Sequence, residues 1–174
     1  MPNLTLVKPT EMPAEHDLTY VMACQKEFAT LFEVPTNAAT RNLYESLIDE
    51  EHEELKELVD LLYVTAGLAY HCGYDIKSTL TYSDITDPDI AVTELVGEVV
   101  SGKHSETILR QLMYVIFNIA AELGYDFIAA YRLVHMSNLT KLGNNGKPIR
   151  RADGKVTKGP NYVPPDLTQL IGKH

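Results

Sequence analysis

The stretch from residue 41 to residue 71 constrains the fold most. It contains no proline and a single glycine, Gly67. Its apolar positions recur at steps of three and four residues: Leu43, Leu47, Leu55, Leu58, Leu62, Thr65 and Ala69. This spacing places their side chains on one face of an α-helix. The stretch therefore predicts either one long helix or two helices separated by a break that the pattern does not locate.

The remainder of the chain shows further helical segments separated by turn residues. Helices are expected at residues 18–32, 90–100, 105–123 and 127–142, with a loop at 77–89. No segment has the alternating pattern of a strand, so we expect an all-α fold, a four- to five-helix bundle. In domain terms, an N-terminal arm at 1–16 precedes a helical domain at 17–142. A basic tail at 143–174 is expected to pack on the same domain.

Two segments of the chain resemble each other. LLYVTAGLAYHCGYD (61–75) aligns with LMYVIFNIAAELGYD (112–126), and seven of the fifteen positions are identical. The shared ending Gly-Tyr-Asp favours internal duplication over chance similarity of two amphipathic helices. We therefore expect an internal helical repeat, because a doubled helical hairpin gives a four-helix core.

Composition limits the classes of partner. Acidic residues outnumber basic ones by 24 to 15, for a net charge of -9, which argues against a broad nucleic-acid surface. A small phosphorylated ligand is compatible with this charge, because a metal ion reverses the local sign. No apolar stretch approaches the roughly 20 residues that span a bilayer, and residues 1–16 do not resemble a signal peptide. We therefore expect a cytoplasmic protein with no membrane partner. Cys24 and Cys72 are expected to be small buried thiols.

An acidic run interrupts the apolar pattern at residues 49–60. On one continuous helix, Glu51 would fall in the middle of the apolar stripe, with Glu54 at its edge. Carboxylates drawn into an apolar face are costly unless they are paired or bound to a metal. Oxygen ligands without cysteine or paired histidine favour magnesium, manganese or calcium over zinc. The run is therefore a candidate metal site.

The same region carries a family resemblance. LIDEEHEEL (47–55) and KELVDLLYVTAGLAYHCGYD (56–75) resemble the EExxE and ExxD signatures of MazG-like and phosphoribosyl-ATP pyrophosphohydrolase-like proteins, an all-α superfamily. VHMSNLTKLG (134–143) resembles its closing helix. The tail GKPIRRADGKVTKGPNYVPPDL (146–167) resembles that of a phage and bacterial subgroup. The resemblance covers roughly residues 28–167.

The resemblance implies a function and a site. It implies cleavage of a (deoxy)nucleoside triphosphate to monophosphate and pyrophosphate with Mg²⁺, for which Mn²⁺ can substitute. Glu51 and Glu54 would be catalytic carboxylates and the first metal pair, with Glu57 and Asp60 as the second pair. Asn138 and Lys141 would reach substrate phosphates.

The basic tail adds candidate substrate residues. Six basic residues and one acid lie between positions 141 and 158, a local inversion of charge. Arg150, Arg151 and Lys158 are candidates for gripping phosphates, and Tyr162 for packing beside a base. A solvated cationic loop is the alternative reading of this segment.

One departure from the family pattern leaves the metal site incomplete. In the family the two acidic pairs lie on antiparallel helices joined by a loop of ten or more residues, whereas two residues separate Glu54 from Glu57 here. One straight helix cannot aim all four carboxylates at one cluster. Glu50, Glu53, Glu94, Glu98 or a second subunit would have to complete the site, and we expect a homodimer or homotetramer.

Two other functions remain open. One is phosphoribosyl-ATP pyrophosphohydrolase activity, which the tail fits less well. The other is a degenerate, non-catalytic helical protein that binds nucleotides. The sequence does not indicate which base or sugar a nucleotide ligand would carry.

Overall fold

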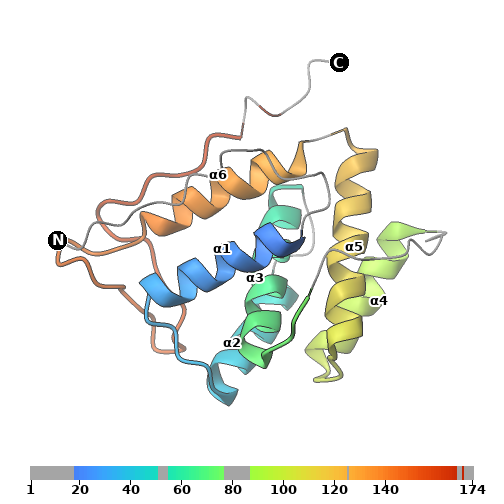
Figure 1. Ribbon diagram of the computed structural model, residues 1–174, viewed down its shortest axis with the longest axis horizontal. Helices are drawn as coiled ribbons and strands as arrows, with labels where there is room; N and C mark the ends of the chain where they lie inside the picture. Colours follow the sequence, from blue (N-terminus) through green and yellow to red (C-terminus); the bar gives the residue numbers. More distant parts are fainter. Residues whose placement is uncertain (1–17, 51–54, 77–86, 125, 168–169, 171–174) are drawn as a thin grey trace.

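The structure is a computed structural model that describes residues 18–50, 55–76, 87–124, 126–167 and 170, with the backbone alone at 46–50, 55–56 and 122. Within these ranges it contains six α-helices and no strand (Figure 1). The helices are α1 Leu18–Leu31, α2 Ala38–Glu50, α3 Leu55–Cys72, α4 Pro88–Val100, α5 Glu106–Glu122 and α6 Phe127–Leu139. The expected all-α class is confirmed. None of the described helices is long and apolar enough to cross a membrane.

Helix α3 is the central element of the bundle. It packs against α1, α2, α5 and α6, and α1 and α6 also contact each other (Figure 1). A helix covered on several sides must be apolar around most of its circumference. Residues 58–69 satisfy this requirement, since all but Asp60 and Val64 are buried. Asp60 is therefore a partly exposed carboxylate within a largely buried segment.

Helices α2 and α3 form an antiparallel hairpin. Near the start of α2, Thr36 Oγ1 lies 3.2 Å from Nδ1 of His71 at the end of α3. Further along, the Tyr44 ring packs against Gly67 so closely that a Cβ on Gly67 would lie 1.9 Å from Tyr44 Cε1. The chain therefore reverses direction between Glu50 and Leu55. The single long helix, one of the two alternatives expected for residues 41–71, is wrong.

The reversal also removes the basis for placing the acidic run on one helix face. Glu51 and Glu54 were placed at and beside the apolar stripe on the assumption of one helix through residues 47–65, and that helix does not exist. Residues 51–54 lie outside the described part of the chain, between the end of α2 and the start of α3. Glu57 and Asp60 belong to the first turns of α3.

Helices α4 and α5 form a second hairpin, and their bounds correspond to those of α2 and α3 at the offset of the sequence repeat. A shift of 51 residues, the offset from Leu61 to Leu112, moves Ala38–Glu50 to 89–101 and Leu55–Cys72 to 106–123. These ranges agree within one residue with α4 and α5. Gly73 and Gly124 follow α3 and α5, each with a φ of 73°, the left-handed conformation that ends many helices. The bounds and endings of the helices thus follow the repeat seen in the sequence.

The later helices begin and end where side chains cap them. Asp87 and Ser105 accept hydrogen bonds from the backbone N–H groups of Ile90 and Ile108, which fixes the starts of α4 and α5. Asp126 does the same for α6. Helix α6 ends at Leu139, three residues earlier than expected, because Thr140 and Lys141 already bond back to Ser137 and Asn138 as a turn.

The segment 141–167, which contains most of the basic tail, lies against α1, α3 and α6. It makes two tight reversals, closed by Gly143 N–H to Lys147 O at 2.8 Å and Arg151 N–H to Lys155 O at 2.9 Å. Its only ladder pairing among the described residues is two isolated antiparallel bridges. Ser137 Oγ donates to Val163 O at 2.6 Å, and Val163 N–H donates to Thr140 Oγ1 at 2.8 Å. These bonds hold the tail beside the end of α6.

Candidate functional site

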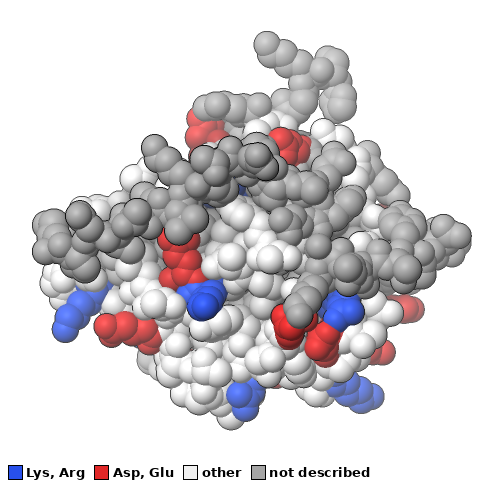
Figure 2. Space-filling model, in the orientation of Figure 1, with Lys and Arg blue, Asp and Glu red and all other residues white. Residues whose placement is uncertain are grey.

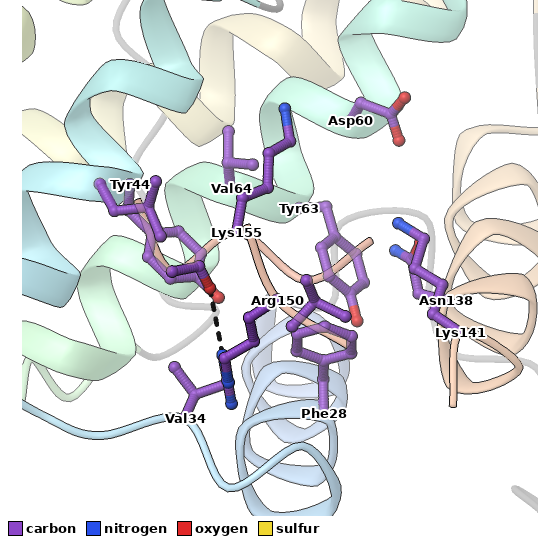
Figure 3. Close-up of a pocket in the computed structure, with 13 residues that line it drawn as sticks. Phe28, Val34, Tyr44, Asp60, Tyr63, Val64, Asn138, Lys141, Arg150 and Lys155 are labelled. Atoms are coloured by element: carbon purple, nitrogen blue, oxygen red, sulfur yellow. Dashed lines mark hydrogen bonds between the residues drawn. The ribbon is translucent and has the colours of Figure 1, made fainter. Parts of the chain in front are cut away.

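A pocket lies where the tail meets α1, α2, α3 and α6. Its volume is about 140 Å³, below the roughly 300–1,000 Å³ of sites that enclose a whole drug-sized ligand. It can therefore enclose only part of a ligand of that size. In Figure 3 the Phe28 and Tyr63 rings lie centrally, Tyr44 and Arg150 on one side, and Asn138 and Lys141 on the other. The lining residues are Phe28, Val34, Leu43, Tyr44, Asp60, Tyr63, Val64, Asn138, Lys141, Arg150, Gly154, Lys155 and Val156.

The charge of the pocket is opposite to that of the whole chain. Three cations line it, Lys141, Arg150 and Lys155, against one acid, Asp60, in a chain of net charge -9. On the surface in Figure 2, by contrast, Lys and Arg side chains lie singly among Asp and Glu side chains. The concentration of positive charge in a concave site suits a compact anion such as a phosphate group.

Asn138 is held in the pocket by a chain of hydrogen bonds that begins at the surface. His135 Nε2 lies 2.9 Å from a carboxylate oxygen of Glu27, and His135 Nδ1 lies 3.1 Å from the Tyr63 hydroxyl. A carboxylate only accepts, so Nε2 carries the hydrogen and the neutral imidazole accepts at Nδ1 from Tyr63. The Tyr63 hydroxyl is in turn hydrogen-bonded by the Asn138 side chain. Each group therefore donates to the next, from Asn138 to Tyr63, from Tyr63 to His135 and from His135 to Glu27. This series of hydrogen bonds orients the Asn138 amide.

Burial supports the neutral state of these groups. Desolvation lowers the pKa of His135, and the hydrogen bond to Glu27 offsets this in part. Desolvation also raises the pKa of Tyr63 well above its usual value, while the hydrogen bond with Asn138 acts in the opposite direction. The Tyr63 hydroxyl therefore stays protonated and is available as a donor to His135.

Arg150 connects the tail to the helical domain. Its guanidinium donates to the backbone carbonyl of Phe32, just after α1. It also donates to Gly154 O at 3.2 Å, the bond dashed in Figure 3. These bonds engage two of its nitrogens with protein carbonyls. Arg150 lines the pocket but also acts as a clamp that positions the second reversal of the tail. That reversal places Lys155 and Val156 in the pocket wall.

Two lysines flank Tyr162 at the edge of this region. The amino groups of Lys158 and Lys141 lie 5.0 Å and 6.0 Å from the centre of the Tyr162 ring, within the range of cation–π attraction. Lys141 also lines the pocket, so it joins the two features. Arg151 instead pairs with Asp153 on an exposed turn. The hydrogen bonds from Arg151 hold the pKa of Asp153 at about 2.

Two of the acids expected at the metal site, Glu57 and Asp60, lie in the described part of α3. Asp60 lines the pocket, and Glu57 lies one turn earlier on the same side of α3. Within the described residues, Oε2 of Glu57 is buried and has no hydrogen-bond partner. A buried carboxylate oxygen without a donor fits a nearby cation, and two carboxylates suit Mg²⁺.

Other predicted acids lie elsewhere or outside the described residues. Glu51, Glu54 and Glu53 fall in 51–54, and the side chain of Glu50 is likewise undescribed. Glu94 and Glu98 are exposed on α4, so they do not turn toward α3 within one chain. In the described part of the chain, no three acid, histidine or cysteine side chains are grouped to hold a metal ion. Glu57 and Asp60 would therefore need ligands from 50–54 or from a second subunit.

Sequence analysis did not identify several residues of the pocket. Phe28, Tyr44 and Tyr63 were not among the predicted site residues, because aromatic residues at helical spacing are usually core. The position of His135, one turn before Asn138, indicated a place near the site. Its hydrogen-bond partners could not be identified from the sequence. Lys155 was counted in the cationic tail without being chosen as a substrate residue.

The pocket brings together Asp60, Asn138, Lys141 and Arg150, four residues of the predicted site. Arg151, Lys158 and Tyr162 lie outside its lining. Comparison of the chain with protein-family models, with curated proteins and with solved structures gave no match.

Proposed function

We propose that the protein is a metal-dependent nucleoside triphosphate pyrophosphohydrolase, which cleaves its substrate to a monophosphate and pyrophosphate. One observation carries this proposal: an acid from α3 and an amide and cations from α6 and the tail line one pocket. These residues lie up to 90 positions apart, from Asp60 to Arg150. The resemblance to the MazG-like superfamily assigned Asp60, Asn138 and Lys141 roles in one site, and Arg150 was a candidate from the cationic tail.

The side chains in and around the pocket suit the two ends of a nucleotide, of which the pocket itself would enclose one part. Lys141 and Lys155 are placed to neutralise phosphate oxygens, and Arg150 adds positive charge beside them. The Phe28 and Tyr63 rings, 5.7 Å apart and nearly perpendicular, offer an apolar surface for a base or sugar. Asn138 presents an oriented amide between these two kinds of surface.

The acids of α3 suit the metal. Glu57 and Asp60 would hold Mg²⁺ or Mn²⁺, together with carboxylates of residues 50–54 or of a partner subunit. The bound metal would neutralise phosphate charge and lower the pKa of a coordinated water. Glu51 or Glu54 would accept the proton of the water that attacks the α phosphorus. The bond to the β phosphate then breaks and pyrophosphate leaves.

A nucleotide panel tests this function directly. The purified chain is incubated with Mg²⁺ and each common ribo- and deoxyribonucleoside triphosphate, and separately with phosphoribosyl-ATP. Monophosphate and pyrophosphate are then measured. We expect release of pyrophosphate from at least one nucleotide and its loss with EDTA. Asp60→Asn and Lys141→Gln should each lower kcat/KM by about 10²-fold or more, because both act on charge that develops in the transition state.

Asp89→Asn is the matched control, because Asp89 is an exposed acid at the start of α4 that has no predicted role in the site. It should retain the parental rate. Nucleotide binding without release of pyrophosphate, unchanged by Asp60→Asn, would favour the non-catalytic binding protein. Cleavage confined to phosphoribosyl-ATP would favour the second enzyme function.

The proposal includes assembly into a homodimer or homotetramer and action on a cytoplasmic nucleotide pool. Glu57 and Asp60 would need further ligands, which a partner subunit could supply in place of residues 50–54. Light scattering on the eluting protein, with and without Mg²⁺, measures the assembly. A monomer that is fully active would exclude a partner's contribution to the site.

A further inference from the structure

A second cluster of reactive side chains lies away from the pocket, where the end of α3 meets α2 and the loop before α5. Cys72 Sγ lies 3.9 Å from His104 Nδ1, and His104 Nε2 lies 2.8 Å from Glu45 Oε1. The side chains of His104 and Glu45 are 16% and 19% exposed. Cys72 is partly exposed as well. A nucleophile, a base and a carboxylate are thus arranged in sequence, and solvent reaches the cluster.

The hydrogen bond between His104 and Glu45 determines which imidazole nitrogen is basic. The Glu45 carboxylate accepts, so Nε2 of the neutral ring carries the hydrogen. The lone pair of Nδ1 then faces the thiol of Cys72. This is the order of groups by which an acid positions an imidazole to take a proton from a nucleophile.

The other cysteine provides a contrast within the same molecule. Cys24 is 4% exposed, and burial raises its pKa to about 12. Both cysteines were expected to be small buried thiols. Cys24 fits that expectation, whereas Cys72 has a base beside it and lies partly in solvent.

Several charged and titratable groups act on Cys72. Burial raises the pKa of its thiol, Arg41 of α2 and a hydrogen bond with Tyr74 lower it, and Glu45 of α2 raises it. The net direction is upward, so the thiol is protonated at neutral pH. Nucleophilic attack therefore depends on removal of the proton as the new bond forms, which is the role His104 can fill.

We propose that Cys72 is a base-assisted thiol that reacts with hydroperoxides and other small electrophiles, with His104 as proton acceptor and Glu45 as positioning residue. In the reaction with hydrogen peroxide, Sγ attacks one oxygen and the O–O bond breaks as the S–O bond forms. His104 takes the thiol proton and returns it to the departing hydroxide, which leaves as water. Sulfur is oxidised to a sulfenic acid, the peroxide is reduced, and the imidazole is neutral again.

The test compares Cys72 with Cys24 in the full chain. The native protein is treated with hydrogen peroxide in the presence of a cyclic 1,3-dione that traps sulfenic acids, and separately with iodoacetamide. Peptide mass spectrometry then gives the labelling rate at each cysteine. We expect Cys72 to react at least about tenfold faster than Cys24 near pH 7, and His104→Asn to remove about tenfold or more of the Cys72 rate.

Two further variants separate base assistance from a structural effect. Glu45→Gln should slow Cys72 less than His104→Asn does, since it leaves the imidazole in place. Lys103→Asn changes the exposed neighbour of His104 and should react like the parent. The rates of the parent and His104→Asn should converge at high pH, where hydroxide removes the proton unaided.

Two results would overturn the proposal. One is equal labelling of Cys72 and Cys24 in the parent. The other is a His104→Asn variant that keeps the parental rate at Cys72. If His104→Asn does not fold by circular dichroism, Glu45→Gln and the parental comparison decide the question, because a parental rate at Cys72 in Glu45→Gln would contradict the proposed arrangement in which the carboxylate positions the imidazole.

Discussion

The close approach of α2 to α3 at Gly67 makes a strong prediction about the hairpin. In Gly67→Ala, the new Cβ would lie 1.9 Å from Cε1 of Tyr44, with Cδ1 and Cζ at 2.6 Å and 2.7 Å. Ordinary carbon contacts lie at roughly 3.5–4.0 Å. The Tyr44 ring is 6% exposed and forms part of the pocket wall, so it cannot move outward without disturbing its neighbours. We expect the substitution to overpack the hairpin.

The magnitude follows from two opposing terms. Alanine in place of glycine in a helix interior stabilises by about 1 kcal/mol. Overpacking a buried contact costs about 1–3 kcal/mol. Gly97→Ala on α4 is the matched control, because nothing lies within 4 Å of a Cβ at that position. Since both variants share the propensity gain, Gly67→Ala should be less stable than Gly97→Ala by about 1–3 kcal/mol.

Urea unfolding followed by circular dichroism measures the free energy of unfolding of both variants. In thermal unfolding the same difference corresponds to about 2–4 °C for each kcal/mol in a chain of this size. Tyr44→Leu combined with Gly67→Ala should recover part of the loss, because the smaller side chain leaves room for the Cβ. If Gly67→Ala proved at least as stable as Gly97→Ala, the tight packing of α2 on α3 would be wrong.

Three further predictions concern single side chains. Tyr63→Phe removes the hydroxyl that links His135 to Asn138 and leaves a buried acceptor at His135 Nδ1 without a donor. The free energy of unfolding in urea should therefore fall by about 1–3 kcal/mol. A fall of less than about 0.5 kcal/mol would contradict this series of hydrogen bonds. Burial lowers the pKa of His71 from 6.5 to about 4, so between those values the unfolded chain binds a proton that the folded chain does not. Stability should therefore fall as the pH is lowered through this window, by about 1.4 kcal/mol for each pH unit at most, and His71→Gln should flatten the dependence. Ser105→Ala removes the cap of α5 and should cost about 1 kcal/mol in the same urea assay, whereas Ser101→Ala, outside that cap, should cost less.

Most of the helices could be predicted from the sequence, but the reversal between α2 and α3 could not. The acidic run around residues 49–57 consists of good helix formers with neither glycine nor proline, so no local signal marks a turn there. The reversal depends on packing between distant positions, in particular Tyr44 against Gly67. A single glycine in the interior of a helix is an ambiguous signal, because it also occurs without any close contact.

Residues of the candidate site could be predicted where their charge differs from that of the surrounding sequence. Asp60 stands out in an apolar helix, and Lys141 and Arg150 stand out in an acidic chain. Tyr44 and Tyr63 do not, because an aromatic residue that lines a pocket has the same helical spacing as one in the core. The cluster of Cys72, His104 and Glu45 combines three separate segments, and no spacing along the chain indicates their contact.

The order in which the pocket walls occur along the chain has a consequence for biosynthesis. The tail is synthesised after the six helices, and Arg150, Gly154, Lys155 and Val156 all belong to it. A nascent chain could therefore pair α2 with α3 and α4 with α5 before these residues exist. The pocket is complete only once Arg150 has been made and reaches the carbonyl of Phe32, 118 positions earlier in the chain.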